Sequence, residues 1–187
     1  MRRTSLLFAL VAFLVVGVMP LRAQSQSRAP APAPGPTEEL LRGWNEVGAK
    51  LIEMAEDFPE DKYDFKPNPE VRSFAEQLLH VAGSTYFFMG IARGQQPGEE
   101  DLSREKYKTK AEVVAALKKS FADGAAFIRE TGDAGLAKSA QYPWSSRPVS
   151  LLGLWADAIE HAGEHYGQLV VYYRVNGLVP PASRPRR

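Results

Sequence analysis

The sequence predicts an all-α fold, a four-helix bundle that follows a signal peptide and a Pro/Ala-rich linker. Apolar residues recur three and four positions apart in four stretches, and each stretch begins at a residue typical of helix starts. No stretch alternates apolar and polar residues for long between turn signals, so we expect no β-sheet. Four amphipathic helices in about 150 residues favour a bundle, an architecture that can hold metal ions between facing helices.

The N-terminal segment, residues 1–23, has the layout of a secretory signal peptide. Arg2-Arg3 precedes an apolar run over residues 6–19, and Ala23 is a small residue suited to cleavage after it. The run is about 15 residues at most, shorter than the roughly 20 that span a bilayer. Leu21 is an uncommon residue three positions before a cleavage site, so an uncleaved anchor remains the alternative. We expect export to the periplasm or the medium, with no stable membrane anchor after cleavage.

Residues 24–36 are rich in proline and alanine and contain nothing to bury, so we expect an extended linker there. The remaining residues, 37–187, have the length of one domain, which would bury about 70% of its surface on folding.

The composition excludes several classes of partner and chemistry. After the signal peptide, 20 basic and 22 acidic residues remain, a net charge of −2. Basic residues form no stripe with interleaved aromatic residues, so we expect no nucleic-acid partner. The sequence contains no cysteine, which excludes disulfides, a lipid-anchored N-terminal cysteine, a thiol nucleophile and thiolate metal ligands. Any metal ion must therefore be held by imidazole, carboxylate or water.

The first two predicted helices have clear start signals. The first opens at Thr37 behind Pro36 and continues to about Phe58, with apolar residues at helical spacing at Leu40, Trp44, Val47, Leu51 and Met54. Residues 59–69 form a polar connection bounded by prolines. The second helix begins at the capping box Ser73-Phe-Ala-Glu76 and ends near Ala92.

The third and fourth helices follow a charged loop over residues 93–108. The capping box Thr109-Lys-Ala-Glu112 starts the third helix, whose apolar period includes Val113, Leu117, Phe121 and Ile128. A loop is expected over residues 131–149. Ser150 caps the longest helix, which ends at Asn176-Gly177 with Pro180-Pro181 beyond, the usual stop signal.

The chain has three histidines, and their positions indicate one site. His161 and His165 stand four residues apart in the fourth predicted helix, so both imidazoles lie on one face, one turn apart. His80, in the second predicted helix, could supply a third ligand. Three protein ligands with an open position are typical of metal sites that perform chemistry. The alternative is that the histidines are inert, hydrogen-bonded residues at the shoulder of packed helices.

A helical wheel places the histidines beside the apolar faces rather than at their centres. On the fourth helix the centre is shared by Leu151, Trp155, Ala162, Tyr166, Leu169 and Tyr173, and the histidines share a column with Leu154 and Tyr172. His80 is offset in the same way, near Gln77 and Ser84. We therefore expect a site at the rim of the core, accessible to solvent. Asp157 and Gln168 are candidate partners for the second imidazole nitrogens, whereas Glu76 is expected to serve the helix cap.

These segments resemble the DinB/YfiT-like superfamily. Its members have one histidine in the second helix and an HxxxH pair in the last, matched here by His80 and by His161-Ala-Gly-Glu-His165-Tyr-Gly-Gln-Leu169. Members also have a tail that ends in Gly-x-x-Pro-Pro, matched here by Gly177-Leu-Val-Pro-Pro181. The resemblance covers residues 37–183 and implies an up-down-down-up four-helix bundle, often a homodimer. It also implies one divalent ion held by His80, His161 and His165.

The resemblance leaves two functions open. Better understood relatives are thiol transferases or isomerases whose metal activates a small cytosolic thiol, and three neutral imidazoles leave the ion its full charge for such an anion. We therefore expect a metal-dependent thiol transferase or hydrolase that acts on a small molecule, or else an exported metal-binding or interaction module without turnover. Zn²⁺ or Ni²⁺ is favoured, with Co²⁺, Fe²⁺ and Mn²⁺ as alternatives. No catalytic side chain is assigned, and the absence of a GxSxG motif and of a spare histidine disfavours a serine–histidine triad.

Overall fold

The computed structural model describes residues 33–95 and 102–185. The predicted signal peptide and the linker up to residue 32 lie outside the described residues. No helix in the described ranges combines the length and the apolar character that crossing a membrane requires.

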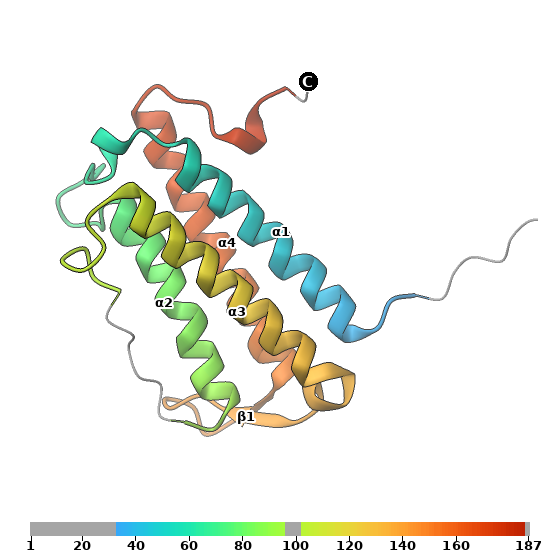
Figure 1. The fold of residues 1–187 in the computed structure, drawn as a ribbon. Helices are drawn as coiled ribbons and strands as arrows, with labels where there is room; N and C mark the ends of the chain where they lie inside the picture. The colour runs from blue at the N-terminus through green and yellow to red at the C-terminus, as the bar shows by residue number, and fades with distance from the viewer. Residues whose placement is uncertain (1–32, 96–101, 186–187) are drawn as a thin grey trace, which may run out of the picture. The chain divides into compact units, whose positions relative to one another are not determined.

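Four long helices make up most of the described chain (Figure 1). They are α1 (Pro36–Asp57), α2 (Phe74–Ala92), α3 (Lys110–Leu136) and α4 (Leu151–Val175), with short 3-10 helices at Glu60–Lys62 and Pro181–Ser183. Helices α1 and α4 run in one direction and α2 and α3 in the other, and α1 and α2 each pack against both α3 and α4. The chain is therefore a mostly helical four-helix bundle, as the sequence predicts.

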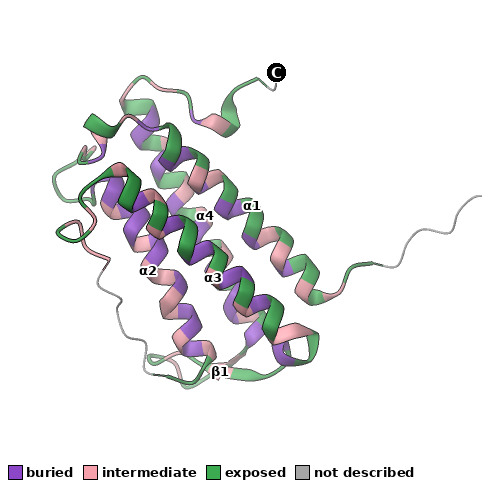
Figure 2. Cartoon of the chain, in the orientation of Figure 1, coloured by how far each residue is buried: buried purple, intermediate pink, exposed green. Residues whose placement is uncertain are grey.

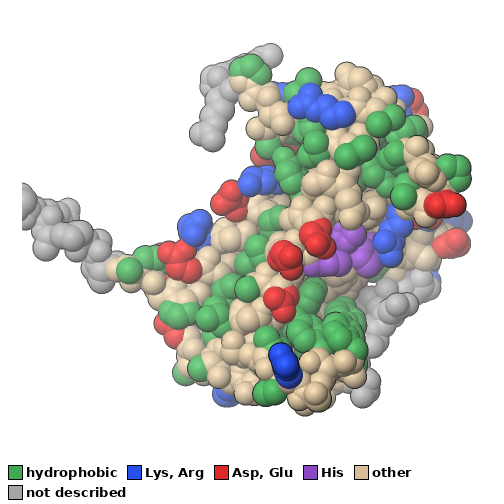
Figure 3. All heavy atoms as spheres, turned by 180° about the vertical axis from the view of Figure 1, so that it is seen from behind, with side chains coloured by type: hydrophobic (Ala, Val, Ile, Leu, Met, Phe, Trp, Pro, Cys, Tyr) green, Lys and Arg blue, Asp and Glu red, His purple; other side chains and the backbone are tan. Residues whose placement is uncertain are grey.

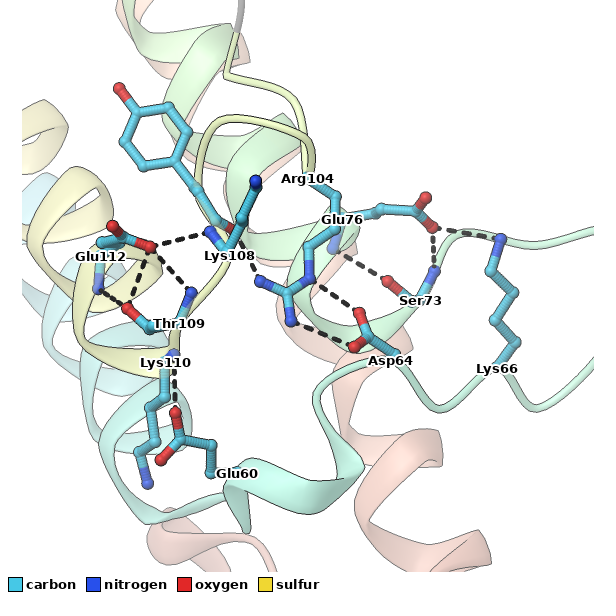
Figure 4. Close-up of polar contacts among 11 residues, drawn as sticks. Glu60, Asp64, Lys66, Ser73, Glu76, Arg104, Lys108, Thr109, Lys110 and Glu112 are labelled. Atoms are coloured by element: carbon cyan, nitrogen blue, oxygen red, sulfur yellow. Dashed lines mark hydrogen bonds and ion pairs between the residues drawn. The ribbon is translucent and has the colours of Figure 1, made fainter.

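The helix starts follow the predicted capping residues. The Ser73 hydroxyl accepts a hydrogen bond from the Glu76 amide at 3.2 Å, and the Glu76 carboxylate accepts one from the Ser73 amide at 2.6 Å. Thr109 and Glu112 form the same reciprocal pair at the start of α3 (Figure 4). Each pair satisfies backbone donors that the first helical turn leaves unbonded, which fixes where the helix begins.

The core lies between the helices, and the buried residues are coloured along the ribbon in Figure 2. Trp44 of α1 contacts Phe121 of α3 and Trp155 of α4, with ring centroids 4.7 and 5.2 Å apart, and its indole donates to the Phe121 carbonyl at 2.9 Å. Glycines permit this approach, because a Cβ atom at Gly48 or Gly124 would lie 2.6 Å from the Phe121 or Trp44 ring. Helices α1 and α3 are thus closely packed, and Trp44 connects this pair to α4.

The segment before α4 differs from the prediction in two respects. Helix α3 continues beyond Thr131 to Leu136 through a kink at Gly132, whose φ of 62° suits glycine. The following loop contains an antiparallel pair of strands, β1 (Ser139–Gln141) and β2 (Pro148–Ser150), so the expectation of no β-sheet was wrong. Strands of three residues are too short to show apolar–polar alternation. The two-stranded hairpin carries Trp144 in its connecting loop.

Candidate metal site

The three histidines come together on one side of the bundle. One ligand nitrogen from each of His80, His161 and His165 lies within 4.8 Å of the other two. His161 and His165 occupy successive turns of α4, and their ring centroids are 4.5 Å apart. His80 of α2 faces both, with centroid distances of 5.3 Å to His161 and 4.7 Å to His165. Two packed helices therefore bring together residues about 80 positions apart in the sequence.

The histidines are more deeply placed than the wheel suggests. Leu154 and Tyr172, which share their column on α4, are fully buried, and His165 is only 6% exposed. Tyr166, expected at the apolar centre, is only half buried. The buried face of α4 is thus turned towards the histidine column, because α2 packs over it. His80 and His161 remain partly exposed, so solvent reaches the site from their side.

Two glutamines fix the orientation of the His165 ring. Its Nδ1 lies 2.9 Å from Gln77 Oε1 and 3.1 Å from Gln168 Oε1, and the Gln77 amide nitrogen donates to Gln168 Oε1 at 3.0 Å. Amide oxygens only accept hydrogen bonds, so we assign the imidazole proton to Nδ1. The lone pair is then on Nε2, and a ligating imidazole usually donates its other N–H in this way.

The predicted partners of the histidines are found only in part. Gln168 contacts His165 as expected, whereas the Asp157 carboxylate accepts a hydrogen bond from the Tyr142 hydroxyl at 2.6 Å in the hairpin region. Glu76 serves the cap of α2, as predicted. Gln77 was not predicted as a partner, although its position three residues before His80, on the same helical face, was the available signal.

Ser84 orients the His161 ring. Its hydroxyl lies 2.9 Å from His161 Nε2 and 2.8 Å from the His80 carbonyl, one turn earlier on α2. A hydroxyl has one proton, so when it donates to the carbonyl it accepts from the imidazole. The rotation of this hydroxyl therefore decides which His161 nitrogen carries the lone pair.

Burial keeps the imidazoles neutral. Burial, with smaller contributions from the neighbouring histidines and from the positive charge of Arg72, lowers the pKa of His80 and of His165 to about 4. The pKa of His161 is also below its usual value because of burial, although the nearby Glu164 and Glu160 act in the opposite direction. Two of the imidazoles are thus unprotonated at pH 7, which is the form that binds metal ions.

The donor set suits a divalent ion. Nitrogens bound at about 2.1 Å in tetrahedral geometry lie about 3.4 Å apart, so the 4.8 Å cluster requires a modest inward rotation. His80 and His161 are only partly buried, which leaves room for that movement. Three neutral nitrogens with no cysteine or carboxylate in the cluster favour metals that accept imidazole, such as zinc or nickel.

A cleft of about 780 Å³ opens beside the histidines. His80 and His161 are part of its wall, which extends to Arg72 and to Trp144. Figure 3 shows the imidazoles at the surface, with acidic side chains on one side, a basic side chain on the other and a cluster of hydrophobic side chains below. A small molecule in the cleft would therefore contact the histidine cluster directly.

The fold and the site together define the class of protein: a four-helix bundle whose second and fourth helices bring three histidines together. Comparison with known protein families identifies the family. The chain belongs to the DinB superfamily, whose model matches residues 44–169. This result confirms the resemblance based on the histidine motifs. A comparison with curated protein sequences finds no match.

Two solved structures from Bacillus subtilis share the fold. The DinB-like protein YjoA has a TM-score of 0.63 at 22% identity, covering 80% of this chain and 99% of its own. YfiT, described as a probable metal-dependent hydrolase with an unusual four-helix bundle topology, has a TM-score of 0.61 at 16% identity. That match covers 81% of this chain and 94% of YfiT. At these identities the likeness establishes the fold alone.

Proposed function

We propose that the protein binds one divalent metal ion through His80, His161 and His165 and uses it in a reaction on a small molecule. The observation that carries this proposal is the cluster of three imidazoles within 4.8 Å, two of which line an open cleft. The description of YfiT as a probable metal-dependent hydrolase supports the same type of chemistry. Hydrolysis and thiol transfer are the two reactions that we consider.

A metal ion held in this way acts as a Lewis acid that makes a bound water or thiol a nucleophile near neutral pH. The chain supplies the other requirements. Gln77 and Gln168 hold the His165 ring, Ser84 holds the His161 ring, and the cleft admits the substrate. All three histidines belong to the cluster, so none remains as the base of a serine–histidine pair.

The open cleft favours an enzyme over a non-catalytic metal-binding module. A module of that kind needs only the cluster, whereas the wall from Arg72 to Trp144 provides surface that a metal ion alone does not contact. We also propose that the protein is exported, on the evidence of its N-terminal segment. Cytosolic thiols would then be scarce around it, so hydrolysis is the better supported of the two reactions.

Metal analysis of purified variants tests the site. We expect one divalent ion per chain in the wild type and in Glu164→Gln, a control that changes an exposed charge next to His165. Alanine at position 80, 161 or 165 should lower metal affinity by more than about 100-fold. Even the substitution of a residue that only hydrogen-bonds a metal ligand lowers metal affinity by about 10- to 100-fold. Stoichiometric metal in all three alanine variants would contradict the assignment.

An activity screen tests the reaction. The wild type is assayed on small esters, amides and lactones, and on electrophiles with a thiol as co-substrate. Activity should disappear with chelation and return with added zinc or nickel, and should be absent from each alanine variant. Turnover that persists in metal-free protein would contradict a metal-dependent reaction. Stoichiometric metal without turnover on any substrate would favour the non-catalytic module.

A further inference from the structure

The cleft beside the histidines is long, and its two ends differ in chemistry. Helix α2 contributes one continuous wall, from Glu76 past His80 and Ser84 to Phe87. With a rise of about 1.5 Å per residue, Glu76 lies about 6 Å before His80 along the axis and Phe87 about 10 Å after it. Arg72 lines the cleft at the first end and Trp144 lies against Phe87 at the second. The histidines are therefore between a cation and an aromatic surface.

Arg72 is a cation available for a ligand. Two arginines line the cleft, and the Arg104 guanidinium is held by both oxygens of Asp64, at 2.7 and 3.1 Å (Figure 4). Within the described ranges the Arg72 guanidinium has no hydrogen bond or ion pair, and only the Arg72 carbonyl is engaged, by Tyr172. Its charge is nevertheless close enough to lower the pKa of all three histidines.

The acidic residues of the wall do not neutralise Arg72. Glu76 bonds the Ser73 amide and pairs with Lys66 at 3.2 Å, and Glu105 is exposed in the segment that precedes α3. A guanidinium with no partner among the described residues is suited to a carboxylate, which it can bind through two parallel hydrogen bonds. The first end of the cleft therefore offers a cation that an anionic group can bind.

Trp144 provides a fixed aromatic surface at the second end. Its side chain is 69% exposed, yet its ring is nearly parallel to Phe87, at 8°, and to Tyr142, at 21°. The Tyr142 hydroxyl is anchored on Asp157, and the Gln141 amide donates to the Ser145 carbonyl at 2.8 Å across the loop. The ring is thus held in place, so its exposed surface can contact an aromatic ligand at little cost in side-chain entropy.

We propose that the cleft binds a small aromatic carboxylate, with the carboxylate on Arg72, the ring on Trp144 and the middle of the molecule against the histidines. The placement of the reacting group rests on the proposed metal-dependent function. The two end contacts do not, because neither Arg72 nor Trp144 belongs to the histidine cluster. Glu76 and Phe87 are about 16 Å apart along the α2 axis, which sets the greatest length of the ligand and suits an aromatic ring joined to a carboxylate by a chain of several bonds.

Three probes measured by calorimetry test the proposal: 6-phenylhexanoate, its neutral amide and hexanoate. We expect the first to bind the wild type at least about 10-fold more tightly than the other two, because each of those lacks one end contact. Arg72→Gln should remove the advantage over the amide, and Trp144→Ala the advantage over hexanoate. Trp144→Phe should restore part of the latter. Arg147→Gln, a cation on the same loop as Trp144 but outside the cleft wall, is the matched control and should bind like the wild type.

The same titrations with metal-free protein and with His161→Ala separate this proposal from the proposed function. Retained binding that depends on Arg72 and Trp144 supports the cleft, whatever the metal analysis shows. Equal binding of the acid and its amide, or of the acid and hexanoate, overturns the proposal, as does the absence of binding at millimolar concentration. Because both side chains are exposed, unchanged thermal unfolding of the variants should confirm that the fold is intact.

Discussion

Gln77→Met is the change that best tests how the candidate site is held. Gln77 is 5% exposed, accepts from His165 Nδ1 at 2.9 Å, and donates to Gln168 Oε1, which is the other acceptor of that nitrogen. Methionine has a similar volume but offers neither a strong acceptor nor a donor. The substitution therefore removes the hydrogen bond from His165 to Gln77. It also removes the hydrogen bond that holds the Gln168 side chain, which is the second acceptor of His165.

The expected loss of zinc affinity is about 10- to 100-fold, or about 1.4 to 2.7 kcal/mol. The lower limit corresponds to one net hydrogen bond of about 1 kcal/mol, and the upper limit adds the cost of a His165 ring that is free to turn. The fold itself should lose less than about 1.5 kcal/mol, because the methionine fills the same space and the core around Trp44 is untouched. Metal affinity should thus be affected more than stability.

The assay is competition for zinc against a chromophoric chelator, with thermal unfolding measured in parallel. Gln77→Glu keeps an acceptor for His165 and should stay within about 10-fold of the wild type. Gln168→Met is the matched control, since Gln168 is exposed and Gln77 remains in place, and it should lose less than Gln77→Met. Wild-type affinity in Gln77→Met, or a larger loss in Gln168→Met, would refute the role assigned to Gln77.

Two further predictions concern protonation and export. Folded His80 and His165, with a pKa of about 4, should be about 1% protonated at pH 6, against about 76% for a free histidine. Zinc binding at pH 6 should therefore release almost no protons from these two residues, and their titration should lower the affinity little between pH 7 and 6. Calorimetry in two buffers that returns about 1.5 protons per ion, the release expected of two free histidines, would contradict this. For export, N-terminal sequencing of protein from the native host should begin at or near Gln24, whereas an intact Met1 in a cytoplasmic fraction would overturn the signal-peptide assignment.

Local signals explain why much of the fold could be predicted. The capping boxes at Ser73 and Thr109 involve residues three positions apart, so the sequence shows the start of each helix directly. The spacing of His161 and His165 likewise places both imidazoles on one face of α4 before any packing is known. These features depend on a single helix.

Features that depend on packing between elements were missed. The Gln77 side chain acts on a histidine 88 residues away, and the apolar period of α2 does not show which residue of α4 it will meet. Asp157 was expected near the histidines, but the hairpin brings the Tyr142 hydroxyl to its carboxylate. The hairpin itself could not be predicted from the sequence, because its strands of three residues are too short to show a periodic pattern.

The capping box of α2 also bears on the kinetics of the candidate site. Arg72, Gln77 and His80 all lie within about two turns of Ser73, so the helix end and the site occupy the same part of the chain. Phe74 in the first turn of α2 is fully buried, so this part of the helix opens only when the core packing around Phe74 is lost. Such opening would separate His80 and Gln77 from α4 together. A ligand that binds only the closed form must in return lower the population of the open form. The rate of that opening would then set an upper limit on how long an ion stays bound.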